Sequence, residues 1–528
     1  METSLLYISS RVAVIKINDG SKYNTKQEYR LVVSGNELSN TISPIINEIR
    51  TTDKVITPLY NLKPNTEYTV CVYTYDSDAP HANKSNSTAP LSVIAFRTKY
   101  ETETLNVKAF GAFGDGVHDD TAAISAAIMC AAKDSRVLIP EGKYFTHGLF
   151  LRSGLKLEIA RGAEIILTTK AEDIPILPAV TPYYDESDDR ILSSWEGNPL
   201  STRAAALTAI GADNVLIYGE GVINGQASYD NWWTFDKNHF TVGRPKLLYF
   251  LNCNCLTLIG LTLKDSPSWT IHPQNCDKLS IYCTEVQNPK DSPNTDGLDP
   301  ECVTNTKIMG MHFSLGDDCI AIKSSKIYLA NRYGKTTSDM IISNCLMEYG
   351  HGAVTVGSEI AGGVFNVTVK DCIFHDTDRG LRIKTRRGRG EKSVIDAVSF
   401  ENIEMKHVLA PFTINEFYFC DPDGHTPYVQ DKNPAPVDYR TPTIKRLSFK
   451  NIDAVDAEYC ASYFLGLPEK PIEEVSMENI TVTFAENAKA GDAIMADGID
   501  KVCKAGIIAE NVKHISKKNV VIDGKLVD

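Results

Sequence analysis

Short segments in which apolar and polar positions alternate recur along the chain from about residue 215. Each has the form apolar–x–apolar–x followed by Asn, Gly, Asp or Cys. The segments begin at Val215, Leu256, Leu279, Thr306, Met340, Val367, Val398, Leu447 and Val475. From Leu256 onward, successive starts are 23, 27, 34, 27, 31, 49 and 28 residues apart, and an irregular period of this size is typical of a solenoid.

The alternation has the two-residue period of a β-strand, and the region lacks helix-length amphipathic segments. One coil of such strands cannot bury its own core, so neighbouring coils must stack. The Asn and Gly residues that end the segments suit left-handed corners, and Asn side chains also form hydrogen-bonded ladders along a stack. The pattern therefore predicts an all-β fold, a parallel β-helix with aliphatic residues inside and loops of variable length outside.

Residues 1–98 have a different pattern and are predicted to form a separate domain, followed by the β-helix over residues 99–528. Short alternating segments, such as Arg11–Ile17 and Tyr29–Val33, are separated by Gly, Asn and Asp. Tyr68 stands near the start of a late segment, which is typical of the tyrosine corner of a β-sandwich. The region resembles a fibronectin type III module. We interpret it as a spacer or packing domain, with a sugar-binding or docking module as the alternative.

One helix is predicted near the start of the β-helix, over residues 122–132. Asp120 is placed to cap its N-terminus, and Ile124, Ala127 and Ile128 form one apolar stripe. Adjacent Asp119 and Asp120 also allow a metal site, but capping is the favoured interpretation. Two long insertions, at about 178–206 with Trp195 and at about 409–445, are expected to carry binding surface.

The formal net charge of -13 argues against nucleic acid or an anionic membrane as a partner. The 13 cysteines are scattered without metal-ligand spacing, so we interpret those inside strand patterns, Cys283, Cys345 and Cys372, as small buried hydrophobes. No stretch is long and apolar enough to span a bilayer. Residues 1–10 lack the pattern of a signal peptide. The location is therefore left open between a cytoplasmic protein and a secreted one whose signal is missing from this sequence.

Unusual polar residues interrupt the strand pattern on adjacent coils. Asp317 lies 11 residues after the repeat start Thr306, and His351 lies 11 residues after Met340. Equal offsets place these two residues side by side, about one strand spacing apart. Asp296 precedes Asp317 by 21 residues, close to one coil. Asp296, Asp317, Asp318 and His351 are therefore expected to meet on one outer patch.

Carboxylates brought together repel one another, so one pKa rises and that group stays protonated while another remains ionised. This is the division of roles that acid–base glycoside hydrolysis requires. A purely structural role for an Asp-Asp pair is common, but three aspartates and a histidine on neighbouring coils make it improbable.

A cluster of cations follows in the segment that contains Arg382 and Lys384. These two residues are two apart on a strand, so both point to one face while Ile383 points inward. In an acidic protein they form the local patch that an anionic substrate needs, and Arg binds a carboxylate through two parallel hydrogen bonds. Arg379 adds to the cluster. Arg386, Arg387 and Arg389 also add to it, but for them a solvated charge run is the favoured interpretation.

The segments Asn294-Thr-Asp296, Gly316-Asp317-Asp318, Gly350-His351-Gly352 and Arg382-Ile383-Lys384, in this order, resemble glycoside hydrolase family 28, the polygalacturonases and their relatives. The resemblance covers about residues 100–520. It implies a right-handed parallel β-helix, an inverting hydrolase of α-linked galacturonic acid, and no metal or other cofactor.

The resemblance also implies a role for each matching residue. Asp317 would protonate the leaving oxygen, Asp296 and Asp318 would activate the attacking water, and His351 would tune or reprotonate the acid. The implied substrate-binding residues are Arg382 and Lys384 for a galacturonate carboxylate, Asn294 for orienting the cluster through hydrogen bonds, and Tyr418 at the substrate site.

Several alternatives remain open. The long loops, the N-terminal module and the segment from Phe417 to His425 look like exo-acting members, because a loop across one end of a groove leaves a pocket that admits only chain ends. An endo-polygalacturonase, or a hydrolase of rhamnogalacturonan or xylogalacturonan, is the nearest alternative. A pectate lyase would need calcium carboxylates and an arginine base, which the motif order does not suggest. The alternative from another class is a non-catalytic carbohydrate-binding solenoid. The oligomeric state is left open.

Overall fold

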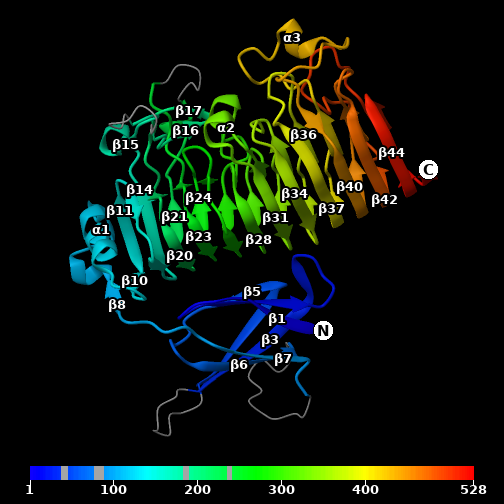
Figure 1. The fold of residues 1–528 in the computed structure, drawn as a ribbon. Helices are drawn as coiled ribbons and strands as arrows, with labels where there is room; N and C mark the ends of the chain where they lie inside the picture. The colour runs from blue at the N-terminus through cyan, green and yellow to red at the C-terminus, as the bar shows by residue number, and fades with distance from the viewer. Residues whose placement is uncertain (37–45, 76–88, 182–189, 235–240, 528) are drawn as a thin grey trace.

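The computed structural model describes residues 1–36, 46–75, 89–181, 190–234 and 241–527. Its two parts are a small antiparallel β-structure at the N-terminus and a long parallel β-helix, stacked one above the other (Figure 1). Within the described residues, no helix is long and apolar enough to cross a membrane.

The N-terminal part consists of two antiparallel sheets that share a core. One sheet has the order β1-β2-β5 and the other β4-β3-β6-β7. Their strands are β1 (Glu2–Ile8), β2 (Ala13–Asn18), β3 (Asn24–Asn36), β4 (Ile46–Lys54), β5 (Ile56–Leu59), β6 (Glu67–Thr74) and β7 (Ser92–Arg97). The hydroxyl of Tyr68 accepts a hydrogen bond of 2.8 Å from the backbone N–H of Lys63, which is the predicted corner contact. The likeness to a fibronectin type III module stays a prediction.

The β-helix has three parallel ladders, so its fold class is the predicted one, a right-handed parallel β-helix. The first ladder contains β8 (Thr104–Asn106), β10 (Arg136–Ile139), β13 (Lys156–Ile159), β20 (Asp213–Gly219), β23 (Asn254–Ile259), β26 (Ser280–Tyr282), β28 (Thr304–Met309), β31 (Thr337–Ser343), β34 (Val364–Lys370), β37 (Val394–Lys406), β40 (Arg446–Ala457), β42 (Ile472–Phe484) and β44 (Val512–Ile522).

The second ladder runs beside the first, and in the last coils the long strands β37, β40, β42 and β44 serve both. Its other strands are β9 (Asp115–Asp119), β11 (Gly142–Thr146), β14 (Ala163–Leu167), β21 (Val222–Asn224), β24 (Thr262–Lys264), β27 (Glu285–Gln287), β29 (His312–Ser314), β32 (Leu346–Glu348) and β35 (Ile373–His375).

The third ladder is continued between its two halves by isolated bridges at Leu298 and Glu301. Its strands are β12 (Leu149–Leu151), β19 (Leu207–Ile210), β22 (Leu248–Leu251), β25 (Ile271–Gln274), β30 (Ile320–Ile322), β33 (Val354–Gly357), β36 (Arg379–Lys384), β38 (Ala410–Asn415), β41 (Cys460–Leu465) and β43 (Ala505–Glu510).

The register of the first ladder confirms the repeats seen in the sequence. Thr306 pairs with Met340, Met340 with Val367, and Val367 with Val398. The corner residues that end the repeats have left-handed backbones, as at Asn402 with φ 55°. Its side-chain amide donates to the Asp371 carboxylate at 2.6 Å, so the predicted corner ladders are present.

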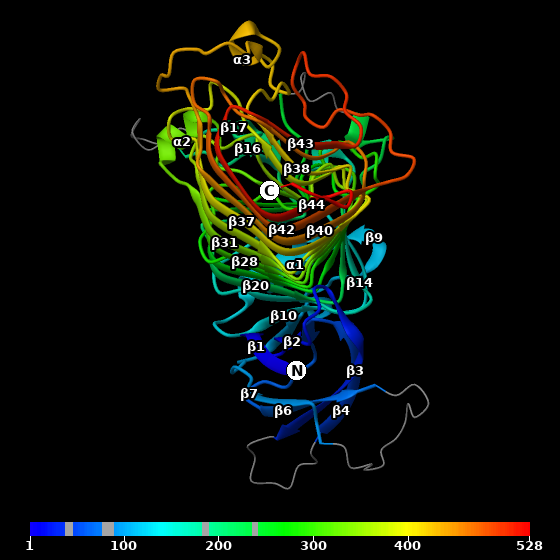
Figure 2. The same ribbon diagram turned by 90° about the vertical axis from the view of Figure 1, so that its right-hand side faces the viewer.

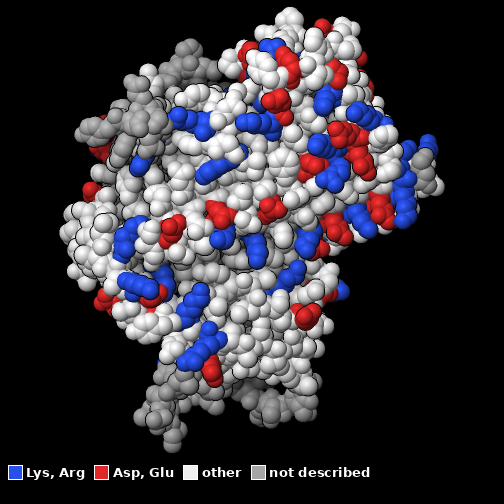
Figure 3. All heavy atoms as spheres, in the orientation of Figure 1, with Lys and Arg blue, Asp and Glu red and all other residues white. Residues whose placement is uncertain are grey.

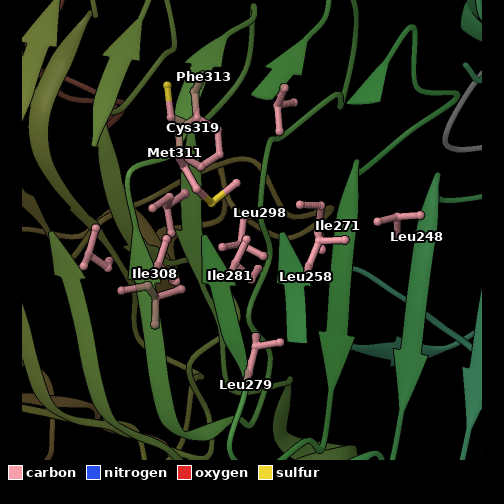
Figure 4. Packing of buried hydrophobic residues seen from close by; sticks show 14 of the residues in the cluster. Leu248, Leu258, Ile271, Leu279, Ile281, Leu298, Ile308, Met311, Phe313 and Cys319 are labelled. Carbon is pink, nitrogen blue, oxygen red and sulfur yellow. The ribbon is translucent and has the colours of Figure 1, made fainter. Parts of the chain in front are cut away.

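Aliphatic and sulfur-containing side chains fill the space between the ladders, as Figure 4 shows around Ile281 and Ile308. Cys345 and Cys372 are fully buried and Cys283 is half-buried, so the interpretation of these cysteines as small core residues is confirmed for the first two. All 13 cysteines are free.

Helices and short strands lie at the first end and in the insertions. They are η1 (Val107–Phe110), α1 (Thr121–Cys130), η2 (Ala171–Asp173), β15 (Ile176–Leu177), β16 (Ser194–Trp195), β17 (Asn198–Pro199), β18 (Thr202–Arg203), η4 (Trp232–Thr234), α2 (Ile327–Tyr333), α3 (Pro427–Gln430), β39 (Thr443–Ile444) and β45 (Lys525–Leu526). Residues 182–189 of the first insertion lie outside the described residues.

Helix α1 buries Ile124, Ala127 and Ile128 against the first coil, as predicted. Side-chain capping by Asp120 is wrong. Asp120 holds the N-cap position, but its carboxylate accepts the backbone N–H groups of Phe113 and Gly114 at 2.6 and 2.9 Å. The buried Asp120 therefore fixes the preceding loop instead of the first turn of the helix.

The N-terminal part packs on the outer face of the first ladder. Val12, Val14 and Ile56 contact Tyr218 and Ile259 in a shared apolar cluster. Figure 2 shows the same contact side on, with the N-terminal part beneath β10 and β20. The third ladder and the insertions lie on the opposite side, so the N-terminal part leaves that face uncovered.

Candidate active site

The third ladder brings the predicted catalytic residues together just before its strands begin. Leu298 pairs with Ile320 and Ile320 with Val354, so Asp296, Asp317 and His351 precede equivalent positions on three successive coils. One carboxylate oxygen from each of Asp296, Asp317 and Asp318 lies within 4.8 Å of those from the other two. The backbone N–H of His351 donates to the Asp317 carbonyl at 3.0 Å. The convergence inferred from equal offsets is confirmed.

The surroundings of the aspartates push their pKa values apart. Asp296 is 5% exposed; burial raises its pKa well above the usual range, and the Asp317 and Asp299 carboxylates raise it further. Burial also acts on Asp318, but the Lys384 ammonium and the Arg382 guanidinium outweigh it and hold that pKa well below its usual range. The cluster therefore combines a carboxyl whose charged form is disfavoured with one whose charged form is favoured. The raised pKa belongs to Asp296, a residue that the resemblance assigns to the attacking water.

Arg382 and Lys384 lie on β36 and reach the same carboxylate. The Arg382 guanidinium donates to one Asp318 oxygen at 3.1 Å, and the Lys384 ammonium donates to the other at 2.7 Å. Ile383 between them is buried in the core. Both cations are nearly buried, at 8% and 9% exposure. The predicted geometry is confirmed, and the contact with Asp318 adds a role that the sequence did not indicate.

His351 is held by a residue that the sequence analysis missed. Its Nδ1 lies 2.9 Å from a carboxylate oxygen of Asp378. This hydrogen bond raises the pKa of His351 against the effect of burial, and the charges of Asp317 and Asp318 raise it further. The sequence could have identified Asp378. It follows His351 by 27 residues, which is the spacing between the repeat starts Met340 and Val367.

The cluster opens into a cavity of about 320 Å³. Its walls come from the third ladder, both insertions and the loop before β43. The lining residues are Glu196, Trp269, Asn294, Asp296, Asp317, Lys323, His351, Ser358, Glu359, Asp378, Arg379, Arg382, Lys384, Tyr418, Cys420, Asp421 and Met495. All the candidate site residues except Asp318, which lies beneath the surface, thus face one cavity.

Tyr418 and Asn294 both line the cavity, but they make different contacts. The Lys384 ammonium lies 5.4 Å from the centre of the Tyr418 ring, so the tyrosine is beside the cation pair as expected. The amide oxygen of Asn294 accepts from Arg244 at 2.6 Å. That hydrogen bond ties Asn294 to the loop before β22, whereas the sequence analysis expected it to orient the aspartates.

Buried charges behind the cavity include several residues that the sequence did not indicate. Lys323 lies 3.4 Å from Asp299 and 3.2 Å from Glu359 and 4.5 Å from the centre of the Trp269 ring. Its position at the end of β30, on the strand that begins with the aspartate pair, was the available signal. Its positive charge lowers the pKa of Asp296 and so opposes the repulsion from Asp317 and Asp299.

The interpretation of Arg386, Arg387 and Arg389 as a solvated charge run is wrong. Their exposures are 6%, 2% and 3%. Arg386 and Arg389 donate to Asp421 at 2.8 and 2.6 Å, and Arg387 donates to Glu469 at 2.6 Å. Arg379 is also buried and paired with Asp378 at 3.3 Å. These arginines hold loops in place, because their charges are matched inside the protein.

Lys and Arg side chains are interspersed with Asp and Glu on the face shown in Figure 3. A broad cationic surface is not seen on that face. The cations Arg382 and Lys384 are instead recessed in the cavity.

The three aspartates are also a set of oxygen donors that could hold a hard cation. Asp318 already has both oxygens bonded to Lys384 and Arg382, and the raised pKa of Asp296 disfavours its charged form. These two features weaken the set as a metal ligand. The expectation that no cofactor is needed stays a prediction, which activity after treatment with a chelator would test.

Residues 191–497, more than half of the chain, match the model of the Glycosyl hydrolases family 28. Residues 104–157 match a second model, named Rhamnogalacturonase A/epimerase, pectate lyase-like. The chain therefore belongs to glycosyl hydrolase family 28 and is a hydrolase.

Similar proteins include plant and bacterial polygalacturonases. A probable polygalacturonase of Vitis vinifera is 27% identical over 389 residues, which are 72% of this chain and 74% of the relative. An endo-polygalacturonase of Pectobacterium carotovorum subsp. carotovorum is 26% identical over 411 residues, 76% of this chain and 89% of the relative.

Two solved structures share the fold. The exopolygalacturonase of Thermotoga maritima has a TM-score of 0.63 and 22% identity, covering 80% of this chain and 92% of its own. The family 28 exopolygalacturonase of Yersinia enterocolitica has a TM-score of 0.65 and 17% identity, covering 99% of this chain and 98% of its own. The second similarity extends over the N-terminal part as well as the β-helix.

Proposed function

We propose that this enzyme hydrolyses α-1,4 linkages between galacturonosyl residues of polygalacturonate or its oligomers. The observation that carries the proposal is the placement of Arg382 and Lys384 against the aspartate cluster, inside a cavity of a family 28 hydrolase. A buried guanidinium and ammonium suit a sugar that carries a carboxylate. Relatives named as polygalacturonases support the same substrate.

The proposed roles follow the differences among the carboxyls. Asp318, held ionised by two cations beneath the cavity surface, keeps a negative charge beside the other two aspartates, and Asp296, which faces the cavity, accepts a proton from the attacking water. The one proton that repulsion keeps in the Asp296–Asp317 pair is carried by Asp317 and passes to the leaving oxygen. The anomeric carbon loses its bond to that oxygen and gains one to the water oxygen, so atoms and protons balance. His351, whose pKa Asp378 raises, assists the return of a proton to Asp317.

Arg382 and Lys384 have donors to spare for the substrate. A guanidinium carries five N–H groups and an ammonium three, and each uses one on Asp318. Arg382 also donates to Met495 Sδ at 2.8 Å, and the donors that these contacts leave over are available to the carboxylate of the sugar next to the scissile bond. The same two side chains thus connect recognition of the galacturonate to the charge of Asp318.

We propose inversion at the anomeric carbon, on the strength of the family resemblance. The closeness of the carboxyls is a reason to test it. Inverting glycosidases ordinarily separate their two carboxyls by about 6.5–9.5 Å, whereas one oxygen of each aspartate here lies within 4.8 Å of one oxygen of each of the other two. Proton NMR of the first product formed would distinguish the two outcomes. An anomeric signal opposite to that of the substrate is expected, and a retained configuration would assign one aspartate as a nucleophile.

We further propose that the enzyme is exo-acting and releases galacturonic acid. Glu196 from the first insertion and Cys420 and Asp421 from the second line the cavity. Lys326 and Arg389 bind Asp421 at 3.0 and 2.6 Å, so the second insertion is fixed over the site. A cavity of about 320 Å³ is at the lower end of the roughly 300–1,000 Å³ range of ligand pockets.

A time course on polygalacturonate, with products separated by size, tests the reaction and the mode together. Galacturonic acid alone from the earliest point is expected. A ladder of saturated oligomers would retain the aspartate mechanism and contradict the exo mode. Absorbance from unsaturated ends would indicate a lyase, and a lack of any product would point to another pectic polymer or to a binding protein.

The variant Asp317→Asn tests the proposed acid. General acid–base groups contribute about 10²–10⁴-fold to rate, so kcat should fall by that factor. Binding of oligogalacturonate, measured by calorimetry, should persist. Activity that survives this substitution would contradict the assignment of Asp317.

A further inference from the structure

Acidic and histidine side chains alternate in a row on the outer side of the second ladder, outside the cavity. Each contacts the next, at distances between 2.7 and 3.6 Å. In order along the β-helix, the row contains Glu285, His312, Glu348, His375, Asp376, His407 and Asp456. The proposed hydrolysis uses none of these residues.

Three members of the row form a compact group of potential ligands. His375 Nδ1 lies 3.3 Å from one oxygen of Asp376, and His407 Nδ1 lies 3.1 Å from the other. One ligand atom from each of the three residues lies within 4.8 Å of the other two. Ligands at the usual distance of about 2.0–2.2 Å around a tetrahedral zinc ion are separated by about 3.3–3.6 Å. Each histidine nitrogen is therefore close to that spacing from the Asp376 carboxylate, and the three ligand atoms have at most 4.8 Å to close on one another.

The coils fix the backbone under these side chains. His375 pairs with Lys406 in the ladder between β35 and β37. Asp376 and His407 follow at equivalent corners, both left-handed at φ 56° and 53°. The N–H of Asp376 donates to Lys406 and that of His407 to Val455, both at 2.9 Å. A rigid scaffold lowers the entropy lost when the side chains converge on an ion.

Neighbouring carboxylates provide the outer contacts that metal-binding histidines usually have. Asp456 lies 3.4 Å from His407 Nε2, the ring nitrogen that does not face Asp376. A carboxylate in this position orients the ring and makes the opposite nitrogen a better ligand. Glu348 lies 3.6 Å from His375 Nδ1 and offers a further oxygen. The side chains of His375, Asp376 and His407 are 34%, 35% and 46% exposed, so an ion and its water have access from solvent.

We propose that His375, Asp376 and His407 bind a divalent transition-metal ion of the Zn²⁺ class, with water or Glu348 completing its coordination. Two imidazoles and one carboxylate favour such an ion over Ca²⁺ or Mg²⁺, which select oxygen ligands. The ligands come from two adjacent coils, so the ion would connect β35 to β37. Because it would bind the folded chain and not the unfolded one, it would raise the unfolding temperature.

The test is calorimetric titration of ZnCl₂ into the metal-stripped full-length protein, lacking a polyhistidine tag, at pH 7.5. One equivalent is expected to bind with a rise in the unfolding temperature. His375→Ala and His407→Ala should each weaken binding by about tenfold or more. His118→Ala is the matched control. His118 is also exposed and paired with one acid, Asp115 at 2.7 Å, but it belongs to neither group of three potential metal ligands among the described residues. It should bind as the wild type does.

Two further outcomes would overturn the proposal. One is an absence of saturable binding, which would show that the row is only a hydrogen-bonded ladder. The other is binding that survives both histidine substitutions but is lost in Asp296→Asn, which would place the ion at the aspartate cluster. Co²⁺ as a spectroscopic probe separates the remaining candidates, because exposed Cys130, Cys420 and Cys503 would give a thiolate charge-transfer band and the proposed site would not.

Discussion

Two groups of cations stand within a few residues of each other and have different roles. Arg382 and Lys384, the cavity pair, both bond Asp318 in the catalytic cluster. Arg386, Arg387 and Arg389, the anchor arginines, bond Asp421, Asp423 and Glu469 in surrounding loops. Both groups are buried and both are paired. The difference lies in the partner carboxylate, which for the cavity pair takes part in the proposed chemistry and for the anchor arginines holds the wall around it.

This comparison shows that cationic character alone does not identify a substrate site. A cation contributes to recognition when it keeps donors facing a cavity, and to stability when its donors are used on the protein. Substitutions in the cavity pair should therefore change turnover, whereas those in the anchor arginines should change stability and leave turnover nearly unchanged.

The largest effect on turnover within the comparison is expected from Lys384→Met in the cavity pair. A hydrogen bond to a charged group is worth about 1.5–3 kcal/mol, so kcat/KM on polygalacturonate should fall roughly 10- to 100-fold. The Met side chain keeps the length of the lysine but removes the charge. Initial rates over a range of substrate concentrations check this, and an unchanged kcat/KM would remove Lys384 from the site.

Arg387→Ala, in the anchor arginines, should affect stability instead. Removal of one partner from a buried ion pair costs about 3–5 kcal/mol, and Arg387 and Glu469 have side-chain exposures of 2% and 4%. The unfolding temperature should fall by several degrees while kcat/KM at 25 °C stays within about threefold. Arg446→Ala is the control, because the Arg446 side chain is 63% exposed in its pair with Asp396 and should leave the midpoint unchanged. A similar fall in both variants would contradict the distinction.

Asp421→Asn tests whether the anchored wall sets the product size. It weakens three charged contacts of 2.6–3.0 Å, to Lys326, Arg386 and Arg389. We expect dimers and trimers to join galacturonic acid among the early products. Asp423→Asn removes only a contact to Arg386 from a side chain that is 53% exposed and should preserve the wild-type pattern.

The outcomes of that experiment separate two ideas. If the wild type itself releases a ladder of oligomers, the exo mode fails whatever the variants do. If the wild type releases only the monomer and Asp421→Asn does the same, the exo mode stands and Asp421 is not what maintains it.

The smallest expected effect is a pH shift in Asp378→Asn. The Asp378 carboxylate is the largest cause of the raised pKa of His351. Without that charge the pKa falls, so the imidazolium loses its proton at lower pH. The alkaline limb of the kcat/KM profile should therefore move toward lower pH, while the acidic limb, which reports the carboxyls, stays in place. An unmoved alkaline limb would exclude His351 as the group that titrates there.

The sequence was sufficient for those parts of the molecule that repeat. Thr306, Met340 and Val367 are paired as their spacing indicated, and the same offsets correctly placed Asp317 beside His351. These predictions succeeded because the strands of successive coils pair in a constant register. Equal offsets from the repeat starts therefore give neighbouring positions. Asp378 obeys the same rule and could have been found by applying the spacing once more.

The parts that could not be predicted depend on contacts between residues whose separation in the sequence does not follow the repeat. Arg387 and Glu469 are 82 residues apart, and nothing near either residue indicates the other. Asp421 lies in an insertion whose position over the cavity depends on Lys326 and Arg389, which belong to other loops. The exposure of the anchor arginines was therefore misjudged, because local sequence reports charge but not the loops that cover it.

The N-terminal part also ties together coils that do not touch one another. It contacts Tyr218 and Ile259 through its apolar residues, Asn344 through Lys16 at 3.1 Å, and Glu404 through Lys22. A stack in which each coil meets only its neighbours can come apart coil by coil, starting at a free end. Because the N-terminal part contacts several separate coils, none of those coils can unfold without breaking its contacts with that part. Local unfolding at either end of the β-helix is thus hindered from spreading to the middle coils, where the cavity lies.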